Sequence, residues 1–185
     1  MVRRLRFSWL MRRFPYRVIR AAFLFINSFI TIAILSAVAM ITRNPFVFPS
    51  LGPTAFLFFY APEAPTASPR HTIYGHALGI LCGYGSLWVF GLTHALPMAE
   101  VGVTPPRIFA AALSLAATSA LMILFKCEHP PAGATTLIVS LGIVSRPFHL
   151  VLIEVAVALL ALQAILINRL AGLYYPLWKA PGEPE

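Results

Sequence analysis

The chain reads Glu128-His129-Pro130-Pro131-Ala132-Gly133-Ala134-Thr135-Thr136 between two apolar runs of membrane-spanning length. Two consecutive prolines remove backbone N–H donors, and a glycine follows them closely, a combination that ends or breaks a helix. A histidine and two threonines accompany the break. The stretch therefore predicts an interrupted helix with polar side chains at membrane depth.

A weaker copy of this stretch occurs earlier, as Pro49-Ser50-Leu51-Gly52-Pro53-Thr54. Three positions match at an offset of 81, which places Pro49, Gly52 and Thr54 on Pro130, Gly133 and Thr135. Three more match at an offset of 78, which places Pro69, His71 and His76 on Pro147, His149 and Glu154. Chance similarity between two apolar segments is the alternative, but we favour an internal duplication.

The composition is that of an integral membrane protein. Hydrophobic residues make up 59% of the 185 residues, charged residues 11%, and the mean hydropathy is +0.80. A hydrocarbon core of about 30 Å takes roughly 17 to 25 apolar residues to cross. Four runs have that length: Ala21 to Ile41, Thr72 to Leu96, Ile108 to Phe125 and Pro147 to Ile167.

The arginines predict the orientation. Half of the 14 basic residues precede the first span, namely Arg3, Arg4, Arg6, Arg12, Arg13, Arg17 and Arg20. Such a cluster favours the cytoplasmic side, where it contacts anionic lipid headgroups, and it explains the net charge of +8 without a nucleic-acid partner. We expect an uncleaved membrane anchor in a bacterial inner (plasma) membrane, with a cytoplasmic N-terminus.

We expect an all-α membrane protein of two similar halves, each with a long helix, a short segment broken by proline and glycine, and a second long helix. The expected order is a basic segment (1–20), a first repeat (21–96), a loop (97–107), a second repeat (108–170) and a short tail (171–185). The broken segments predict half-helices over Pro53 to Tyr60, with Pro53 at the first position, and over Ala134 to Val144. Four spans with two re-entrant segments, or six crossings as two inverted repeats, fit equally well.

Gly75, Gly79 and Gly83 recur at steps of four in the second long run. This spacing gives one helix face without side chains and permits close approach of a neighbouring helix, within the protomer or between protomers. We expect a homo-oligomer.

The two broken segments suggest an anion site. A helix N-terminus presents unpaired N–H groups and a partial positive charge, so two such ends facing each other would bind a small anion. We expect the substrate-binding residues to be Gly52, Thr54, His129, Gly133, Thr135 and Thr136, with Pro49, Pro53, Pro130 and Pro131 shaping the breaks. Thr54 and Thr135 as simple helix caps, and His129 as a partner of a backbone carbonyl, are the structural alternatives.

Ionisable residues within spans suggest a proton or polar relay through His76, His129 and Glu154. His76 and Glu154 would exchange protons or hydrogen-bond each other across the two halves. A packing role for His76, and a Glu154 that is neutral or paired with Arg146, are the alternatives.

Signals for catalysis or metal binding are missing from the sequence. Cys82 and Cys127 have no partner at metal-ligand spacing, the chain contains no aspartate, and no motif for a cofactor, a phosphate loop or a catalytic triad occurs. We expect no cofactor and no metal, and an enzyme using His129 and Glu128 is the weakest hypothesis.

The chain resembles the HPP family of integral membrane proteins. The resemblance rests on Glu128-His129-Pro130-Pro131-Ala132-Gly133-Ala134-Thr135, on Pro49-Ser50-Leu51-Gly52-Pro53-Thr54-Ala55, and on Ser68-Pro69-Arg70 followed by Gly75-His76, and it covers roughly Ala21 to Leu170. It implies a family usually described with four transmembrane segments, some of whose plastid and cyanobacterial members are linked to nitrite transport.

We therefore expect a transporter or channel for a small monovalent anion, with nitrite as one candidate. The competing hypothesis is a membrane scaffold or subunit that does not transport and that binds another membrane protein through its glycine face. Sequence does not separate nitrite from nitrate or formate.

Overall fold

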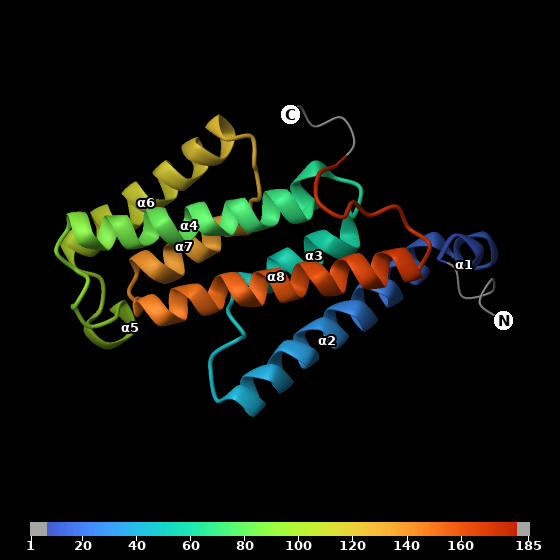
Figure 1. The fold of residues 1–185 in the computed structure, drawn as a ribbon, viewed down its shortest axis with the longest axis horizontal. Coiled ribbons are helices and arrows are strands. Elements are labelled where there is room, and N and C mark those ends of the chain that lie inside the picture. The colour runs from blue at the N-terminus through green and yellow to red at the C-terminus, as the bar shows by residue number, and fades with distance from the viewer. Residues whose placement is uncertain (1–6, 181–185) are drawn as a thin grey trace.

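The computed structural model describes residues 7–180, and the regular elements among them are all helical. In chain order they are α1 (Phe7–Arg13), α2 (Tyr16–Thr42), α3 (Leu51–Tyr60), the 3-10 turn η2 (Pro65–Ala67), α4 (Pro69–Val89), α5 (Met98–Val101), α6 (Pro105–Leu124), α7 (Ala132–Ser140) and α8 (Pro147–Leu170) (Figure 1). The expected all-α class is confirmed. Arg3, Arg4 and Arg6 of the basic segment, and residues 181–185 of the tail, lie outside the described residues.

Three of the described helices, α2, α6 and α8, are long and apolar enough to cross a membrane. α2 begins at Tyr16 rather than at the predicted Ala21, so Arg17 and Arg20 belong to its first turns. The loop predicted over residues 97–107 holds the short helix α5 and the start of α6 at Pro105.

α4 is the fourth expected span, and it differs from the other three. Its 21 residues would rise about 31 Å, but they include Arg70, His71 and His76. α4 packs against α6, α7 and α8, so much of its surface meets protein and does not need to be apolar. The predicted end at Leu96 is wrong, because the helix stops at Val89 and the chain turns at Gly91 with a φ of 66°.

The two half-helices exist, with boundaries that differ from the prediction. α3 begins at Leu51, which makes Pro53 its third residue, still within the first turn where a missing N–H is tolerated. α7 begins at Ala132 and ends at Ser140, before the left-handed Gly142 with a φ of 77°. With 10 and 9 residues, the two helices rise about 15 and 14 Å, close to half a hydrocarbon core each.

Contacts between distant segments define one end of the helix bundle. The backbone N–H of Phe7 donates to the carbonyl of Ala171 (3.1 Å), and that of Arg70 donates to the carbonyl of Trp178 (3.1 Å). Arg20 of α2 donates to the carbonyl of Tyr60 at the end of α3. The start of α2, the end of α3, the start of α4 and the end of α8 therefore lie together, at an end that we call the terminal end (Figure 1).

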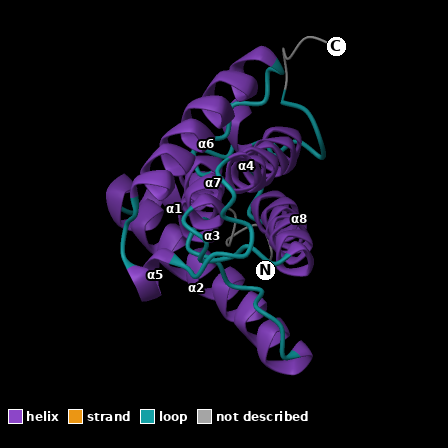
Figure 2. Cartoon of the chain, turned by 90° about the vertical axis from the view of Figure 1, so that its left-hand side faces the viewer, coloured by secondary structure: helices purple, strands orange, loops and turns teal. Residues whose placement is uncertain are grey.

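The opposite end of the bundle holds the start of α6 and the end of α7. The N–H of Met98 in α5 donates to the carbonyl of Leu141 (3.0 Å), and Arg107 of α6 reaches the carbonyls of Leu96 and Ser140. The end of α7 therefore lies at this distal end. α3 and α7 point toward opposite ends of the bundle, and the end-on view in Figure 2 places both among the long helices.

The glycine face of α4 packs on α7 and on the residues before it. A Cβ added to Gly75 would lie 2.7 Å from Cβ of His129, and one added to Gly79 would lie 2.8 Å from the carbonyl oxygen of Ala132. A Cβ on Gly83 would lie 2.8 Å from the carbonyl oxygen of Thr136. All three distances are shorter than atoms tolerate, so the glycines permit this approach within one chain.

Candidate functional site

The imidazole of His76 connects the first turns of the two half-helices. Its Nε2 lies 3.0 Å from Oγ1 of Thr54 in α3, and its Nδ1 lies 2.7 Å from Oγ1 of Thr135 in α7. Each threonine is the fourth residue of its helix, and all three side chains are fully buried. The two broken segments that match in sequence therefore meet on one side chain of α4.

His129 completes this cluster from the loop before α7. Its Nδ1 lies 2.7 Å from the carbonyl oxygen of Thr66, and its Nε2 lies 3.3 Å from Oγ1 of Thr54. The rings of His76 and His129 are 5.0 Å apart between centroids, and Phe58 of α3 packs on the other side of His129 at 6.5 Å. His129 is fully buried. Its ring bonds a backbone carbonyl, as the structural alternative expected, and it also lies beside Thr54.

A more polar rim lies toward the terminal end. Nδ1 of His71 donates to the carbonyl of Glu128 (3.0 Å) and lies 3.8 Å from Oε2 of the same residue. Nη1 of Arg70 donates to the carbonyl of Lys126 (2.8 Å). His71, Arg70 and the Glu128 carboxylate thus surround the outer side of the loop that carries His129.

The threonines do not act as helix caps. Oγ1 of Thr54 lies 2.9 Å from the carbonyl oxygen of Ser50, one turn earlier in the same helix, which is not a capping bond. The residues at the N-cap positions, Ser50 and Pro131, make no side-chain capping bond. The hydroxyls of Ser50 and Thr136 are fully buried and have no hydrogen-bond partner. Unsatisfied buried hydroxyls therefore lie in both half-helix starts, whereas the N–H groups of Leu51, Ala132, Gly133 and Ala134 donate to backbone carbonyls.

The glycines and prolines of the breaks have simpler surroundings. Gly52 and Pro53 are exposed on the outer surface of α3, and a Cβ on Gly52 would meet nothing within 4 Å. A Cβ on Gly133 would meet only the flexible end of Leu115, at 3.4 Å. Pro49 and Pro130 are also exposed, whereas Pro131 is buried. Gly52 therefore lies outside the buried cluster that contains Thr54, and its predicted contact with substrate stays a prediction.

Glu154 does not join the cluster. Both carboxyl oxygens are buried in α8 without a hydrogen-bond partner. The expected bond with His76 is therefore wrong, because both ring nitrogens of His76 meet threonine hydroxyls instead. The alternative pairing with Arg146 is also absent, because neither carboxyl oxygen of Glu154 has a hydrogen-bond partner. Residues 69–76 and 147–154 are similar in sequence, but their ionisable residues His76 and Glu154 do not form a hydrogen bond with each other.

Sequence reasoning missed the role of Arg107, which it placed at the end of a connecting loop. The side chain is 2% exposed, and its Nη1 and Nη2 donate to the carbonyls of Ser140 (3.2 Å) and Leu96 (2.8 Å). A guanidinium at the C-terminal end of α7 complements the negative end of the helix dipole. Its position directly after Pro105-Pro106, in the first turn of α6, is the signal that could have indicated a buried cap.

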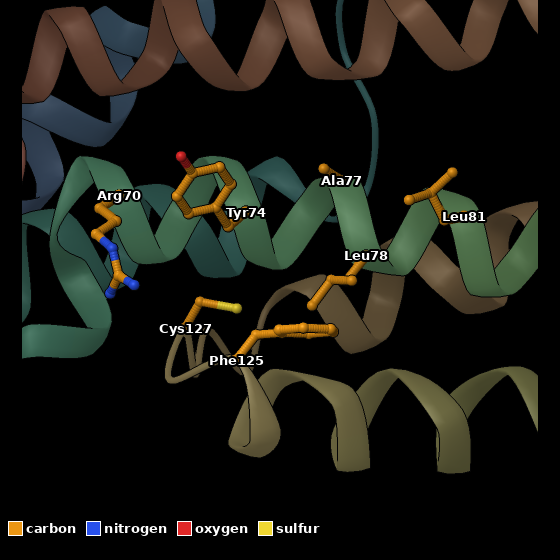
Figure 3. A pocket seen from close by; sticks show the side chains of 7 residues that line it. All are labelled: Arg70, Tyr74, Ala77, Leu78, Leu81, Phe125 and Cys127. Atoms are coloured by element: carbon orange, nitrogen blue, oxygen red, sulfur yellow. The ribbon is translucent and has the colours of Figure 1, made fainter. Parts of the chain in front are cut away.

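A surface groove borders the cluster between α4 and the end of α6. It has a volume of about 430 Å³ and is lined by Arg70, Tyr74, Ala77, Leu78, Leu81, Phe125 and Cys127 (Figure 3). Cys127 precedes His129 by two residues and is itself 1% exposed. Apart from Arg70, the groove is mainly apolar, as expected for a surface in contact with lipid chains.

No three His, Cys, Asp or Glu side chains among residues 7–180 come together in a way that could hold a metal ion. The histidine cluster consists of hydrogen bonds to hydroxyl and carbonyl oxygens, which suits polar or proton chemistry.

Comparison with known proteins identifies the family. The family described as HPP, transmembrane region, matches residues 14–176, which covers the long helices and both half-helices. The chain belongs to the HPP transmembrane family. It is an integral membrane protein, and its HPP motif is the loop and first turn that carry His129 and Thr135.

Two transmembrane proteins of Dictyostelium discoideum are similar to this HPP protein. One is 31% identical over 154 residues, covering 79% of this chain and 46% of the relative, and the other is 30% identical over 134 residues, covering 70% and 44%. The chain thus spans less than half the length of these relatives. No solved structure matches it. The expected bacterial membrane stays a prediction, because both relatives are eukaryotic.

Proposed function

We propose that this HPP protein transports a small monovalent anion across its membrane, and that the anion binds where the first turns of α3 and α7 meet. Nitrite is the first candidate. The observation that carries the proposal is the position of His76 between Thr54 and Thr135, because it joins the two half-helix N-termini in one buried polar site.

The charge of the two helix starts favours an anion. Each helix N-terminus carries roughly half a positive charge, and the effect is strongest within the first turn. Ser50 and Thr136 add buried hydroxyls that lack partners, and a bound anion would supply the missing acceptors. Hydroxyl donors hold an anion without a fixed cation, which allows it to leave again.

We propose six crossings for the topology. Residues 44–60 and 126–140 each connect the two ends of the bundle through an irregular stretch followed by a half-helix. In this arrangement Arg43, Arg107 and Arg146 face the side opposite to the N-terminus, whereas Arg12, Arg13, Arg17, Arg20, Arg70, Lys126, Arg169 and Lys179 face the N-terminal side. This bias supports a cytoplasmic N-terminus.

A carrier fits the burial of the site better than an open channel. Thr54, His76, His129 and Thr135 are all fully buried, so an anion reaches them only after helices move. Irregular backbone at membrane depth, here residues 125–131, is typical of transporters in which broken helices bind substrate.

The competing scaffold hypothesis loses its sequence argument. The glycine face on which it relied is covered by α7 of the same chain and is not available to another protein. We therefore propose transport rather than a scaffold role. A homo-oligomer remains a separate prediction.

Uptake of nitrite into proteoliposomes tests the proposal. Thr54→Val and Thr135→Val keep the side-chain shape and remove one hydroxyl each. We expect each to lower uptake about fivefold or more, since one hydrogen bond is worth about 1 kcal/mol. Thr31→Val is the matched control, because Thr31 is also fully buried and bonds the carbonyl one turn earlier, in α2 (2.8 Å).

The control variant should transport at nearly the wild-type rate. Uptake by folded wild-type protein no greater than in empty vesicles, for nitrite, nitrate and formate alike, would overturn the anion proposal.

A further inference from the structure

The polar groups around His129 and Thr54 have one hydrogen fewer than their hydrogen bonds require. The carbonyl of Thr66, 2.7 Å from Nδ1, is only an acceptor, so Nδ1 of His129 carries a hydrogen. Thr72 agrees with this assignment, because its hydroxyl donates to the carbonyl of Ser68 (2.9 Å) and therefore faces Nδ1 (3.4 Å) as an acceptor. In a neutral imidazole, Nε2 of His129 is then a bare acceptor.

Thr54 cannot satisfy its three neighbours with one hydroxyl hydrogen. Its Oγ1 lies 2.9 Å from the carbonyl of Ser50, 3.0 Å from Nε2 of His76 and 3.3 Å from Nε2 of His129. We assign the hydrogen of His76 to Nε2, with the Thr135 hydroxyl donating to Nδ1, because the other tautomer would leave Thr54 facing three acceptors with one hydrogen. The Thr54 hydrogen can then bond either the Ser50 carbonyl or the unprotonated Nε2 of His129, and the other acceptor is left without a donor.

A proton on Nε2 of His129 resolves this conflict. His129 would then donate from both nitrogens, to Thr66 and Thr54, and the Thr54 hydrogen would be free for the Ser50 carbonyl. A second proton on His76 does not resolve it, because Thr54 would still face two acceptors. The deficit therefore belongs to one atom of one residue.

A proton at this position needs a counter-charge. The cluster is fully buried, and an isolated charge in such a place is very unfavourable unless it is paired. The titratable groups around His129 are His76 and His71 of α4 and Cys127 and Glu128 of its own loop, and Arg70 of α4 lines the groove beside Cys127. Tyr175 of the tail lies behind Phe58, with the two rings 6.1 Å apart.

These neighbours do not supply an anion inside the cluster. The Glu128 carboxylate lies at the rim, 3.8 Å from His71, with its side chain 45% exposed. Glu154 of α8 makes no hydrogen bond to any of these residues. An anion held at the two helix starts beside Thr54 would provide the counter-charge.

We propose that the protein carries one proton with each monovalent anion, and that Nε2 of His129 is the atom that binds the proton. The inference rests on the proposed function and specifies its coupling. As the anion enters, Nε2 takes a proton from the water on that side, and as the anion leaves, Nε2 releases the proton to the water on the other side, so the loaded protein gains no net charge and transport is electroneutral. Thr54 then acts as a positioning residue that turns its hydroxyl from His129 to Ser50.

Transport measurements in proteoliposomes test the coupling. With nitrite at neutral pH, an internal pH dye should report one proton taken up per nitrite, at a rate that a potassium-valinomycin potential does not change. Protein-free vesicles are the control, because nitrous acid crosses bilayers unaided. In His129→Asn, whose amide can still donate to Thr66, uptake should lose its dependence on the pH gradient.

The outcomes separate the two proposals. Absence of any anion flux in wild-type protein would overturn the proposed function. Flux that follows the membrane potential without proton uptake, or that keeps its pH-gradient dependence in His129→Asn, would overturn the coupling and leave anion transport standing.

Nitrogen-15 spectra of histidine-labelled protein in nanodiscs give a readout that does not depend on flux. The signals of His129 are assigned by their loss in His129→Asn. Without anion, His129 should be protonated at Nδ1 alone, and saturating nitrite should protonate Nε2 as well, while His76 keeps its hydrogen on Nε2. A His129 that is unchanged by nitrite, or doubly protonated without it, would overturn the proposal.

Discussion

Thr54 and Thr135 stand 81 positions apart in the sequence, and their hydroxyls contact the two ring nitrogens of the same histidine, His76. The similarity between the two broken segments is therefore matched by a shared contact in space. A mutation in either segment should act on the same buried site, and a mutation in the packing that brings them together should act on both.

Gly79→Ala should destabilise the protein by about 1–3 kcal/mol, because its Cβ would lie 2.8 Å from the Ala132 carbonyl and would push α7 away from α4. Gly85→Ala is the matched control on the same helix, since a Cβ there meets nothing within 4 Å. We expect Gly85→Ala to be neutral or stabilising by up to about 1 kcal/mol. Thermal unfolding in detergent checks both, and equal melting temperatures for the two variants would contradict the packing.

Arg107→Met should destabilise the distal end of the bundle. The change removes two charged hydrogen bonds, each worth about 1.5–3 kcal/mol, and leaves the buried carbonyl of Ser140 and the part-buried carbonyl of Leu96 without their donor. Hydrogen exchange should rise around Gly142, whose Cβ position lies 3.0 Å from Nη1 of Arg107. The exposed Arg146→Met is the control and should leave exchange unchanged; a similar rise there would speak against a capping role.

Cysteine labelling distinguishes the two topologies. In a background with Cys82 and Cys127 changed to alanine, Glu63→Cys and Val103→Cys place thiols on exposed positions at the terminal and distal ends. Six crossings predict that Glu63→Cys reacts from the same side as Arg13→Cys, and Val103→Cys from the other side. Four spans with re-entrant segments predict the reverse pattern, so one experiment with a membrane-impermeant maleimide decides.

Tyr175→Phe should loosen the C-terminal tail, because the hydroxyl donates to the Ala67 carbonyl at 2.6 Å in a buried site. The loss should be about 0.5–1.5 kcal/mol. Burial also raises the pKa of Tyr175. Below the ordinary phenol pKa of about 10, both folded and unfolded states keep the proton, so the bond contributes fully.

Above that pH, the unfolded chain releases the Tyr175 proton and the folded chain does not, so stability falls as pH rises. Melting temperatures between pH 8 and pH 11 should fall less steeply in Tyr175→Phe than in the wild-type protein. Parallel curves would contradict a buried, protonated Tyr175.

The sequence predicted the all-α class and the approximate positions of the helix breaks, because proline and glycine have local consequences. Thr54, His129 and Thr135, which the sequence singled out as polar residues in apolar surroundings, lie together in one buried cluster, and their role in anion binding stays a prediction. The relation between His76 and Glu154 was wrong, because sequence similarity between two halves does not indicate which side chains face each other. Which helix covers the glycines, and where Arg107 points, depend on tertiary packing that periodicity does not show.

A double-mutant cycle on nitrite uptake tests the central claim that both breaks form one site. Uptake is measured in proteoliposomes for wild type, Thr54→Val, Thr135→Val and the double variant, with Thr31→Val combined with Thr135→Val as the reference cycle. If His76 joins the two threonines in one site, the double variant should transport within about twofold of the weaker single variant, because contacting residues are not additive. Losses that multiply would contradict a shared site, and in the reference cycle the double variant should transport like Thr135→Val alone.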